Sequence, residues 1–382
     1  MIKRNIYVLY AIGFLQGMVF YAPVATLYRQ AAGIGIFQIT LIESISLALM
    51  IGLEIPWGWM ADRIGYRKTM LICCGLYFVS KLVFWKARSF GGFLLERILL
   101  SVVCAGLSGV DSSILYLSCG EEDSHRVFSI YQNVSEAGLI LAAGAYALWI
   151  GEDYRLAGLL TVFSYGAAAL LALGLKEVKK PERKEGSGLR EAVSILKGQL
   201  GNRKILLLVI SAALVGQTHQ AVTVFLNQLQ YTRAGMSGQM ISAAYIAVSI
   251  TGLVGGFSAR LCARAGAGTM GKRLLLLSLG CCLLLALSRY PLVSVLAVVG
   301  LRGCYSLLQP LYMNLENRLV TTRDRATALS MNAAAEDGIG IFLNLLFGYA
   351  ADCDVSWAML LGGGMCLVSL LCYRESRCFA EP

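Results

Sequence analysis

The chain has 382 residues, of which 57% are hydrophobic and only 15% are charged, whereas a soluble domain carries about 25% charged residues. With a mean hydropathy of +0.66, the composition excludes an ordinary soluble domain and indicates a protein that crosses a membrane many times. The net charge of +10 does not indicate nucleic-acid binding, because the lysines and arginines lie in the gaps between apolar stretches rather than on one amphipathic face.

Twelve apolar segments are long enough to cross the hydrocarbon core, which takes about 20 residues. The first begins after Lys3-Arg4 and continues past the length of a signal peptide without a cleavage site, so we expect an uncleaved helix. The predicted fold class is therefore an all-α polytopic membrane protein with twelve transmembrane helices. In chain order these spans are 5–30, 38–61, 68–87, 91–118, 126–150, 155–176, 203–230, 237–263, 272–288, 291–318, 326–351 and 355–374.

The basic residues indicate the orientation. Of the lysines and arginines, 24 fall at the two termini and in the gaps on the same side, and seven fall on the other side. By the positive-inside rule both termini are cytoplasmic, in a multi-pass protein of the inner (plasma) membrane. The outer seven include Arg29 and Lys81, and Lys81 is expected to reach the outer surface along its stem. Arg97 and Arg302 remain inside spans.

The longest polar segment divides the spans into six and six. The predicted domains are an N-terminal six-helix bundle (1–176), a cytoplasmic linker (177–202) and a C-terminal six-helix bundle (203–382). Motifs repeat between the halves at similar offsets, as Glu136-Ala137-Gly138 does in Glu336-Asp337-Gly338, 200 residues on. This repetition predicts two pseudo-symmetric bundles that arose from a duplicated six-helix unit.

One loop motif lies between the second and third spans, within Gly58–Lys68. Two glycines allow a tight turn and close helix packing, and an acid and a basic cluster accompany them. The segment resembles the loop between the second and third helices of the major facilitator superfamily of secondary transporters. The resemblance implies two bundles around a central cavity, alternating access, and a latch of the halves at Asp62 and its neighbours. The matching residues are Gly58, Asp62, Arg63, Gly65, Arg67 and Lys68.

Two further acids, Glu54 and Asp111, stand in segments that resemble a branch of this superfamily containing many drug and metabolite exporters. Each is a candidate for substrate contact or for a hydrogen bond at a gate.

Acids near the middle of spans are candidates for a proton or cation site. Glu136 lies ten residues after Arg126, about 15 Å into the membrane, and Glu336 stands at the matching depth. A charge there is costly, so such groups line a cavity or pair with a partner. The alternative is that Arg97 or Arg302 neutralises them. The polar residues beside the two glutamates are Gln132, Asn133, Asn332 and Asp337.

Arg97 and Arg302 either bind an anionic substrate or pair with protein acids, because arginine stays charged. The seventh span is unusually polar, and its His219 is either a proton shuttle or a hydrogen-bonded residue near the outer face. The further polar residues predicted to face a cavity are Gln217, Gln220, Gln309 and Tyr21.

No nucleophile–base arrangement or phosphate-binding loop is present, so we expect no enzyme activity and no cofactor. The twelve cysteines lack metal-site spacing. The expected partners are a small-molecule substrate, protons and the lipid bilayer, with the protein a monomer. The leading hypothesis is proton-coupled export of a small amphipathic compound or metabolite. The alternatives are nutrient or metabolite uptake by symport or facilitated diffusion, and a non-transporting receptor on the same scaffold.

Overall fold

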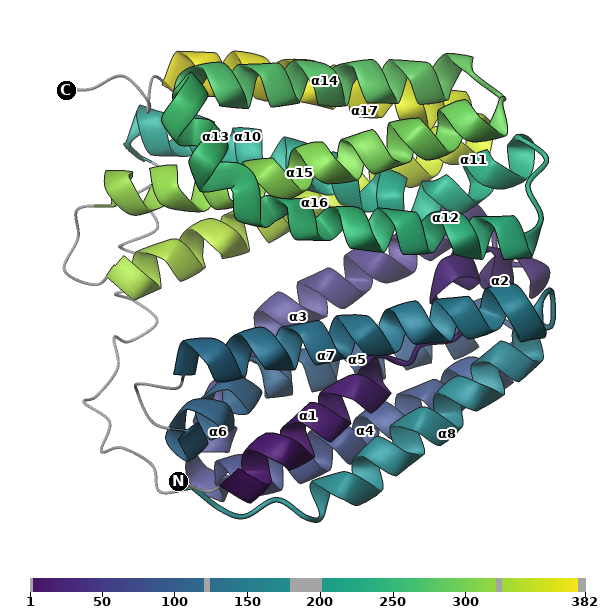
Figure 1. Cartoon of the computed structure of the whole chain (residues 1–382), viewed down its shortest axis with the longest axis vertical. Helices are drawn as coiled ribbons and strands as arrows, with labels where there is room; N and C mark the ends of the chain where they lie inside the picture. Colours follow the sequence, from purple (N-terminus) through teal and green to yellow (C-terminus); the bar gives the residue numbers. More distant parts are fainter. Residues whose placement is uncertain (1–2, 120–123, 179–200, 321–324, 377–382) are drawn as a thin grey trace. The chain divides into compact units, whose positions relative to one another are not determined.

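The computed structural model describes residues 3–119, 124–178, 201–320 and 325–376, and these residues form helices without a strand (Figure 1). The predicted all-α class is confirmed. The chain divides into two compact units. The first takes in the described residues of Met1–Glu182 and of Ser237–Ile246, and the second those of Arg183–Met236 and of Ala247–Pro382. Most of the predicted linker, 179–200, lies outside the described residues.

Long helices separated by short breaks make up the first unit. The predicted first span is interrupted because Pro23, in the first turn of η1, cannot continue a helix. In chain order the elements are α1 (Lys3–Gly17), η1 (Ala22–Val24), α2 (Ala25–Ala31), α3 (Ile36–Ile64), α4 (Tyr66–Lys86), α5 (Phe90–Leu107), α6 (Val110–Cys119), α7 (Ser124–Ala145), the π-helical η2 (Tyr146–Ile150) and α8 (Tyr154–Ala172).

The second unit has the same composition of long helices with local irregularities. Its elements are α10 (Arg203–Gln220), the π-helical η3 (Ala221–Leu226), α11 (Asn227–Arg233), α12 (Gly238–Thr251), the 3₁₀ turn η4 (Gly252–Phe257), α13 (Ser258–Ala265), α14 (Ala267–Leu287), α15 (Pro291–Leu319), α16 (Arg325–Cys353) and α17 (Val355–Ser376). The larger part of α12, residues 238–246, belongs to the first unit.

The predicted spans correspond to these helices. Among the described residues, eleven helical segments are long and apolar enough to cross a membrane. The remaining predicted span, 326–351, is the 29-residue helix α16. It falls outside that set and carries Glu336 and Asp337 near its middle.

The packing of the helices repeats between the units. In the first unit α1 packs against α7 and α8, and α4 packs against α5 and α8. In the second, α10 packs against α16 and α17, and α14 against α15 and α17. Two sets of helices that pair in the same order are what a duplicated six-helix unit produces.

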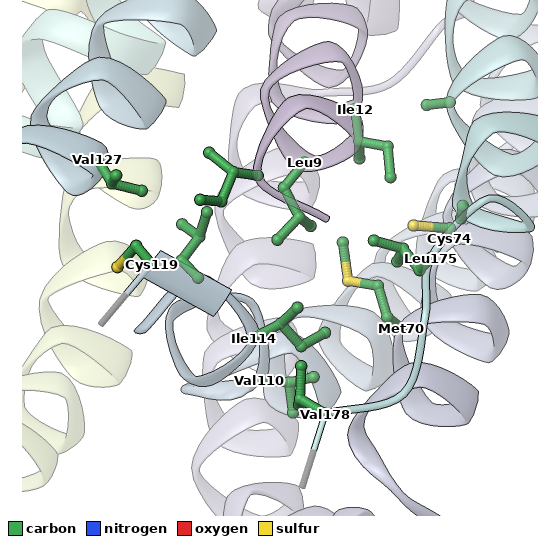
Figure 2. Packing of buried hydrophobic residues seen from close by; sticks show 14 residues of the cluster. Leu9, Ile12, Met70, Cys74, Val110, Ile114, Cys119, Val127, Leu175 and Val178 are labelled. Carbon is green, nitrogen blue, oxygen red and sulfur yellow. The ribbon is translucent and has the colours of Figure 1, made fainter. Parts of the chain in front are cut away.

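Each unit has its own apolar core. In the first unit, buried side chains of α1, α4, α6 and α7 meet, and Leu175 and Val178 after α8 join them (Figure 2). In the second, Leu208, Leu275, Leu311 and Tyr373 join α10, α14, α15 and α17. These cores hold the polar sites in fixed positions.

Two glycines bring α1 and α7 into close contact. A Cβ atom added to Gly17 would lie 2.1 Å from the carbonyl oxygen of Ser135, and one added to Gly138 would lie 2.2 Å from that of Phe14. Only glycine permits such an approach of two helix backbones. Gly138, first noticed as part of a repeated motif, is therefore a packing residue.

Candidate functional site

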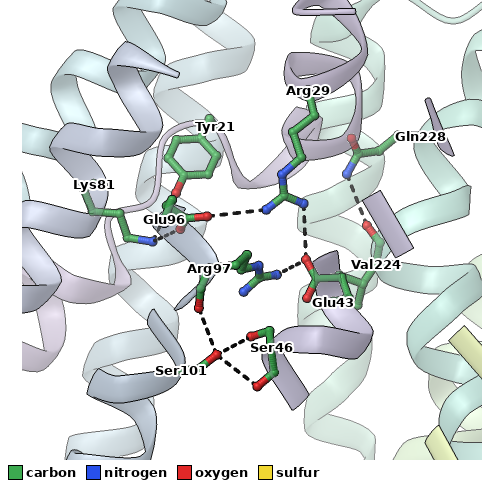
Figure 3. Close-up of polar contacts among 10 residues, drawn as sticks. All are labelled: Tyr21, Arg29, Glu43, Ser46, Lys81, Glu96, Arg97, Ser101, Val224 and Gln228. Carbon is green, nitrogen blue, oxygen red and sulfur yellow. Dashed lines mark hydrogen bonds and ion pairs between the residues drawn. The ribbon is translucent and has the colours of Figure 1, made fainter. Parts of the chain in front are cut away.

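Five charged side chains gather in the first unit (Figure 3). Arg29 comes from α2, Glu43 from α3, Lys81 from α4, and Glu96 and Arg97 from α5. Four of these side chains are less than 10% exposed, and Arg97 is 20% exposed. The helices that carry most of them, α3, α4 and α5, pack against one another, which is why residues so far apart in the sequence meet.

Ion pairs connect the five charges. Glu43 Oε1 accepts hydrogen bonds from Arg29, at 3.3 Å, and from Arg97. Glu96 lies 3.7 Å from Lys81 Nζ and 3.9 Å from Arg29 Nη2. The Lys81 ammonium also donates to the Tyr21 hydroxyl, at 3.2 Å. Tyr21, a predicted cavity residue, therefore belongs to this charge cluster.

The charge cluster has three positive and two negative groups. Buried charges are stable only when paired and hydrogen-bonded, and Arg97 satisfies this requirement through Glu43. Of the two predicted alternatives for Arg97, the structure shows pairing with a protein acid.

The prediction that Lys81 reaches the outer surface is wrong. Its side chain is 6% exposed because Glu96 on the adjacent helix binds the ammonium inside the unit. Arg29, counted among the outer surface charges, is likewise buried. Sequence reasoning also missed Glu43 and Glu96. The available signal was that each acid lies inside an apolar span, although Glu43 is 14 residues from the nearest basic residue, Arg29, and only packing brings the two together.

A cavity of about 250 Å³ lies within the second unit. One face of α15 supplies most of its wall, and α10 and α16 complete it. Its lining residues are Ala212, Tyr305, Gln309, Tyr312, Met313, Glu316, Asn317, Leu329, Ala333 and Glu336. The cavity thus combines aromatic and apolar side chains with amides and two carboxyl groups.

The carboxyl groups of Glu316 and Glu336 contact each other at this cavity, and Asn332 lies beside Glu316. Glu316 is only 9% exposed. Two carboxylates in contact repel each other, so ionisation of both at once is disfavoured. Sequence analysis singled out Glu336 and Asn332. Glu316 was not among the predicted site residues, because the contact is made across two helices.

A second group of polar residues, Arg302, His219 and Thr223, forms around an earlier part of α15 than the one that carries Glu316. Arg302 donates to Nε2 of the buried His219, at 3.3 Å, and His219 also hydrogen-bonds Thr223, at 3.1 Å. The His219 and Tyr305 rings stack, with centroids 4.1 Å apart. Of the two expectations for His219, this geometry is that of a hydrogen-bonded residue.

The other predicted residues take different positions. Glu136 is half-buried on α7, without an ion pair among the described residues, and Gln132 and Asn133 beside it are exposed. Glu136 and Glu336 therefore have unlike surroundings. Asp111, on the first turn of α6, accepts a 3.4 Å hydrogen bond from the Tyr131 hydroxyl. The remaining ones are Asp337 (half-buried), Gln217 (buried against Gly340), and Gln220, Gln309 and Glu54 (exposed).

The loop motif begins on α3 and continues into α4. Gly65 has a φ of +95°, a conformation that favours glycine. After it, Arg67 Nε donates to the Leu175 carbonyl at 2.6 Å, and the Arg67 backbone N–H donates to Glu177 at 3.3 Å. The turn is thus bound to the segment that follows α8. Arg63 and Lys68 are exposed, and the surroundings of Gly58 and of the Asp62 side chain lie outside what the structure describes.

Comparison with known proteins gives one family. The sequence model described as Major Facilitator Superfamily matches residues 6–345. No curated protein matches the sequence.

Solved structures share the fold. The nucleoside transporter NupG superposes with a TM-score of 0.82 at 14% identity, over 99% of this chain and 100% of that one. A bacterial homologue of the human lysosomal transporter Spinster, inward-facing and unoccupied, gives 0.76 at 16% identity, over 98% and 96%. A D-xylose–proton symporter gives 0.72 at 13% identity, over 97% of each chain. At these identities the likeness shows a common fold.

Proposed function

The chain belongs to the major facilitator superfamily of membrane transporters, and we propose that it moves a small polar solute by alternating access, coupled to protons, with the cavity of the second unit as part of its transport site. The proposal includes a monomer in the inner (plasma) membrane with both termini cytoplasmic, since the basic residues gather on that side. We also propose that the predicted domains 1–176 and 203–382 are the two bundles of the transporter and that 177–202 links them.

The observation that supports proton coupling is the contact between Glu316 and Glu336 at the cavity wall. A carboxyl pair that shares one proton changes its charge by one unit when that proton leaves. Acids of this kind inside membrane spans serve as proton relays. Because the pair borders the cavity, its charge acts directly on a solute held there.

Uptake by proton symport is the direction we favour. The cavity offers the amide groups of Gln309 and Asn317 and the Tyr305 hydroxyl as hydrogen-bonding partners for a hydroxylated solute. Two of the similar structures are a nucleoside transporter and a D-xylose–proton symporter, and nucleosides and D-xylose both carry hydroxyl groups.

Export of an amphipathic compound is the second candidate. The same cavity has aromatic and apolar walls at Tyr312, Met313 and Leu329, and a flat apolar compound would bind to them. A receptor without transport activity is a third reading, which predicts that ligands bind but do not cross the membrane. For the loop motif we propose a gating role centred on Asp62, with Arg67 fixing the turn.

The test is a reconstitution in liposomes with a pH gradient, using a panel of nucleosides, pentoses and amphipathic dyes as solutes. We expect solute accumulation that follows the gradient, and acidification or alkalinisation of the lumen when solute is added. Accumulation with inward proton movement identifies symport, and solute and proton movement in opposite directions identifies export by exchange.

The variants for this test are Glu336→Gln and Glu316→Gln, with Glu152→Gln on an exposed loop as the control. Both cavity variants should uncouple solute from proton movement, and the control should behave as the wild type. Full coupling in both cavity variants would rule out the carboxyl pair as the proton site.

A further inference from the structure

Two arginines at corresponding positions in the two units differ in whether an acid neutralises them. Arg97 on α5 and Arg302 on α15 each precede an acid by 14 residues, Asp111 and Glu316. Arg97 forms an ion pair with Glu43. Arg302 forms none: among the described residues, no carboxylate lies within 4.0 Å of its guanidinium.

Arg302 contacts His219, but this contact does not neutralise the positive charge of the arginine. His219 Nε2 lies 3.3 Å from the guanidinium and 3.1 Å from the Thr223 hydroxyl. A histidine carries no negative charge in any protonation state, so it does not compensate the charge of the guanidinium. The Nε atoms of Arg302 and Arg97 are both buried without a hydrogen-bond partner, so the two arginines differ in the acid that Arg97 has and not in this atom. No acid in the described part of the chain therefore neutralises this permanent positive charge inside a membrane span.

Arg302 lies on the same helix face as the cavity wall. Tyr305, Gln309 and Glu316 follow it at intervals of 3, 7 and 14 residues, spacings that place side chains on one face of a helix. Tyr305 lines the cavity and lies close enough to both Glu336 and Arg302 to interact electrostatically with each. One end of this face is therefore acidic and the other is positive.

We propose that Arg302 binds an anionic oxygen group, a carboxylate or phosphate, of the transported solute. The inference rests on the proposed transport function and adds the charge of the solute to it. A guanidinium without an acid partner recognises such groups through paired N–H donors, and the Gln309 amide and Tyr305 hydroxyl on the cavity wall are placed to bind the uncharged part of the solute. Arg97, already paired, has no such role.

The binding test uses matched neutral and anionic probes on purified protein in a non-ionic detergent: glucose with glucuronate, and uridine with uridine monophosphate. Affinity is measured by calorimetry or by the shift in unfolding temperature. We expect the wild type to bind at least one anion more tightly than its neutral counterpart. Arg302→Gln should weaken that binding by about 10- to 100-fold, and Arg289→Gln, an exposed arginine of the same unit, should not.

A second measurement needs no ligand. Replacing a partly buried charge that has no acid partner by a neutral amide removes an unfavourable desolvation, whereas breaking an ion pair leaves a charge uncompensated. Arg302→Gln should therefore raise the unfolding temperature of the ligand-free protein, and Arg97→Gln should lower it. Repeating the titrations in nanodiscs with and without phosphatidylglycerol separates a solute from a lipid headgroup, because a headgroup ligand would make the effect of Arg302→Gln depend on the anionic lipid.

The proposal is overturned if neither anion binds the wild type more tightly than its neutral counterpart, if Arg302→Gln keeps the preference, or if Arg302→Gln destabilises the protein as much as Arg97→Gln. It is also overturned if the Arg302→Gln effect appears only with anionic lipid. Proton-coupled transport of neutral solutes by the wild type, with no binding or transport of the anionic ones, would leave the proposed function intact and remove only this inference.

Discussion

At the scale of single residues, Glu43 is the acid that pairs with two arginines of the first unit. Arg29 and Arg97 both hydrogen-bond its Oε1 atom inside the first unit. Glu43→Gln should lower stability by about 3–5 kcal/mol, because it leaves buried charges without their partner. The unfolding midpoint in detergent measures the effect, and Glu54→Gln, an exposed acid on the same helix, is the control. Equal midpoints for the two variants would show that the pair contributes little.

A second residue-scale prediction concerns pH. Asp354, between α16 and α17, has a pKa below its usual value because the backbone N–H and hydroxyl of Ser356 hydrogen-bond its carboxylate, with a smaller effect of Arg233. The Ser356 N–H donates at 2.6 Å.

Since the folded state holds the proton of Asp354 more weakly, its contribution to stability is present above the unfolded-state pKa of about 3.9 and is lost as the pH falls through the lower folded-state value. Asp354→Asn should therefore lower the unfolding temperature at neutral pH, and the difference from wild type should shrink toward about pH 3. A difference that stays constant with pH would contradict the assignment.

Single residues also show where sequence reasoning succeeds. Glu336 and Arg302 could be singled out because each is an ionisable group deep in an apolar run. The partners of such groups could not be predicted from the sequence. Glu316 contacts Glu336, and Lys81 contacts Glu96, only because separate helices pack together. Lys81 was also misplaced because its position near the end of a span suited a side chain that reaches the surface.

At the scale of helices, hydropathy predicts that spans exist but not where they break. The break between α5 and α6 depends on Gly109, with a φ of +76°, and the π-helical segments η2 and η3 have no signal in an apolar run. These breaks matter because they set the direction of polar side chains such as Asp111 at the start of α6.

The close approach of α1 and α7 gives a prediction at this scale. Gly138→Ala would place a Cβ atom 2.2 Å from the Phe14 carbonyl oxygen, so the two helices must separate. We expect a loss of stability of about 1–3 kcal/mol or more, as for overpacked cores, with reduced expression. Gly338→Ala, at the corresponding motif position of the second unit, meets no atom within 4 Å and should be tolerated. Similar unfolding temperatures for the two variants would argue against the close approach.

At the scale of the whole molecule, the two units repeat their helix pairing but differ in their chemistry. The first unit holds a charge cluster whose two arginines pair with glutamates. The second holds a carboxyl pair, a cavity and Arg302, which has no carboxylate within 4.0 Å in the part of the chain that the structure describes. The repeated motifs in the sequence predicted the duplication. They also suggested that Glu136 and Glu336 were equivalent, which the surroundings of the two acids do not support, because helix contacts diverge faster than the helix order.

The measurement that tests the proton site most directly is infrared spectroscopy of the purified protein at neutral pH. If Glu316 and Glu336 share a proton, the wild type should show the C=O stretching band of a protonated carboxyl group. Glu336→Gln should remove that band, and Glu152→Gln should leave it unchanged. A wild-type spectrum without the band, or the same band in Glu336→Gln, would contradict the account.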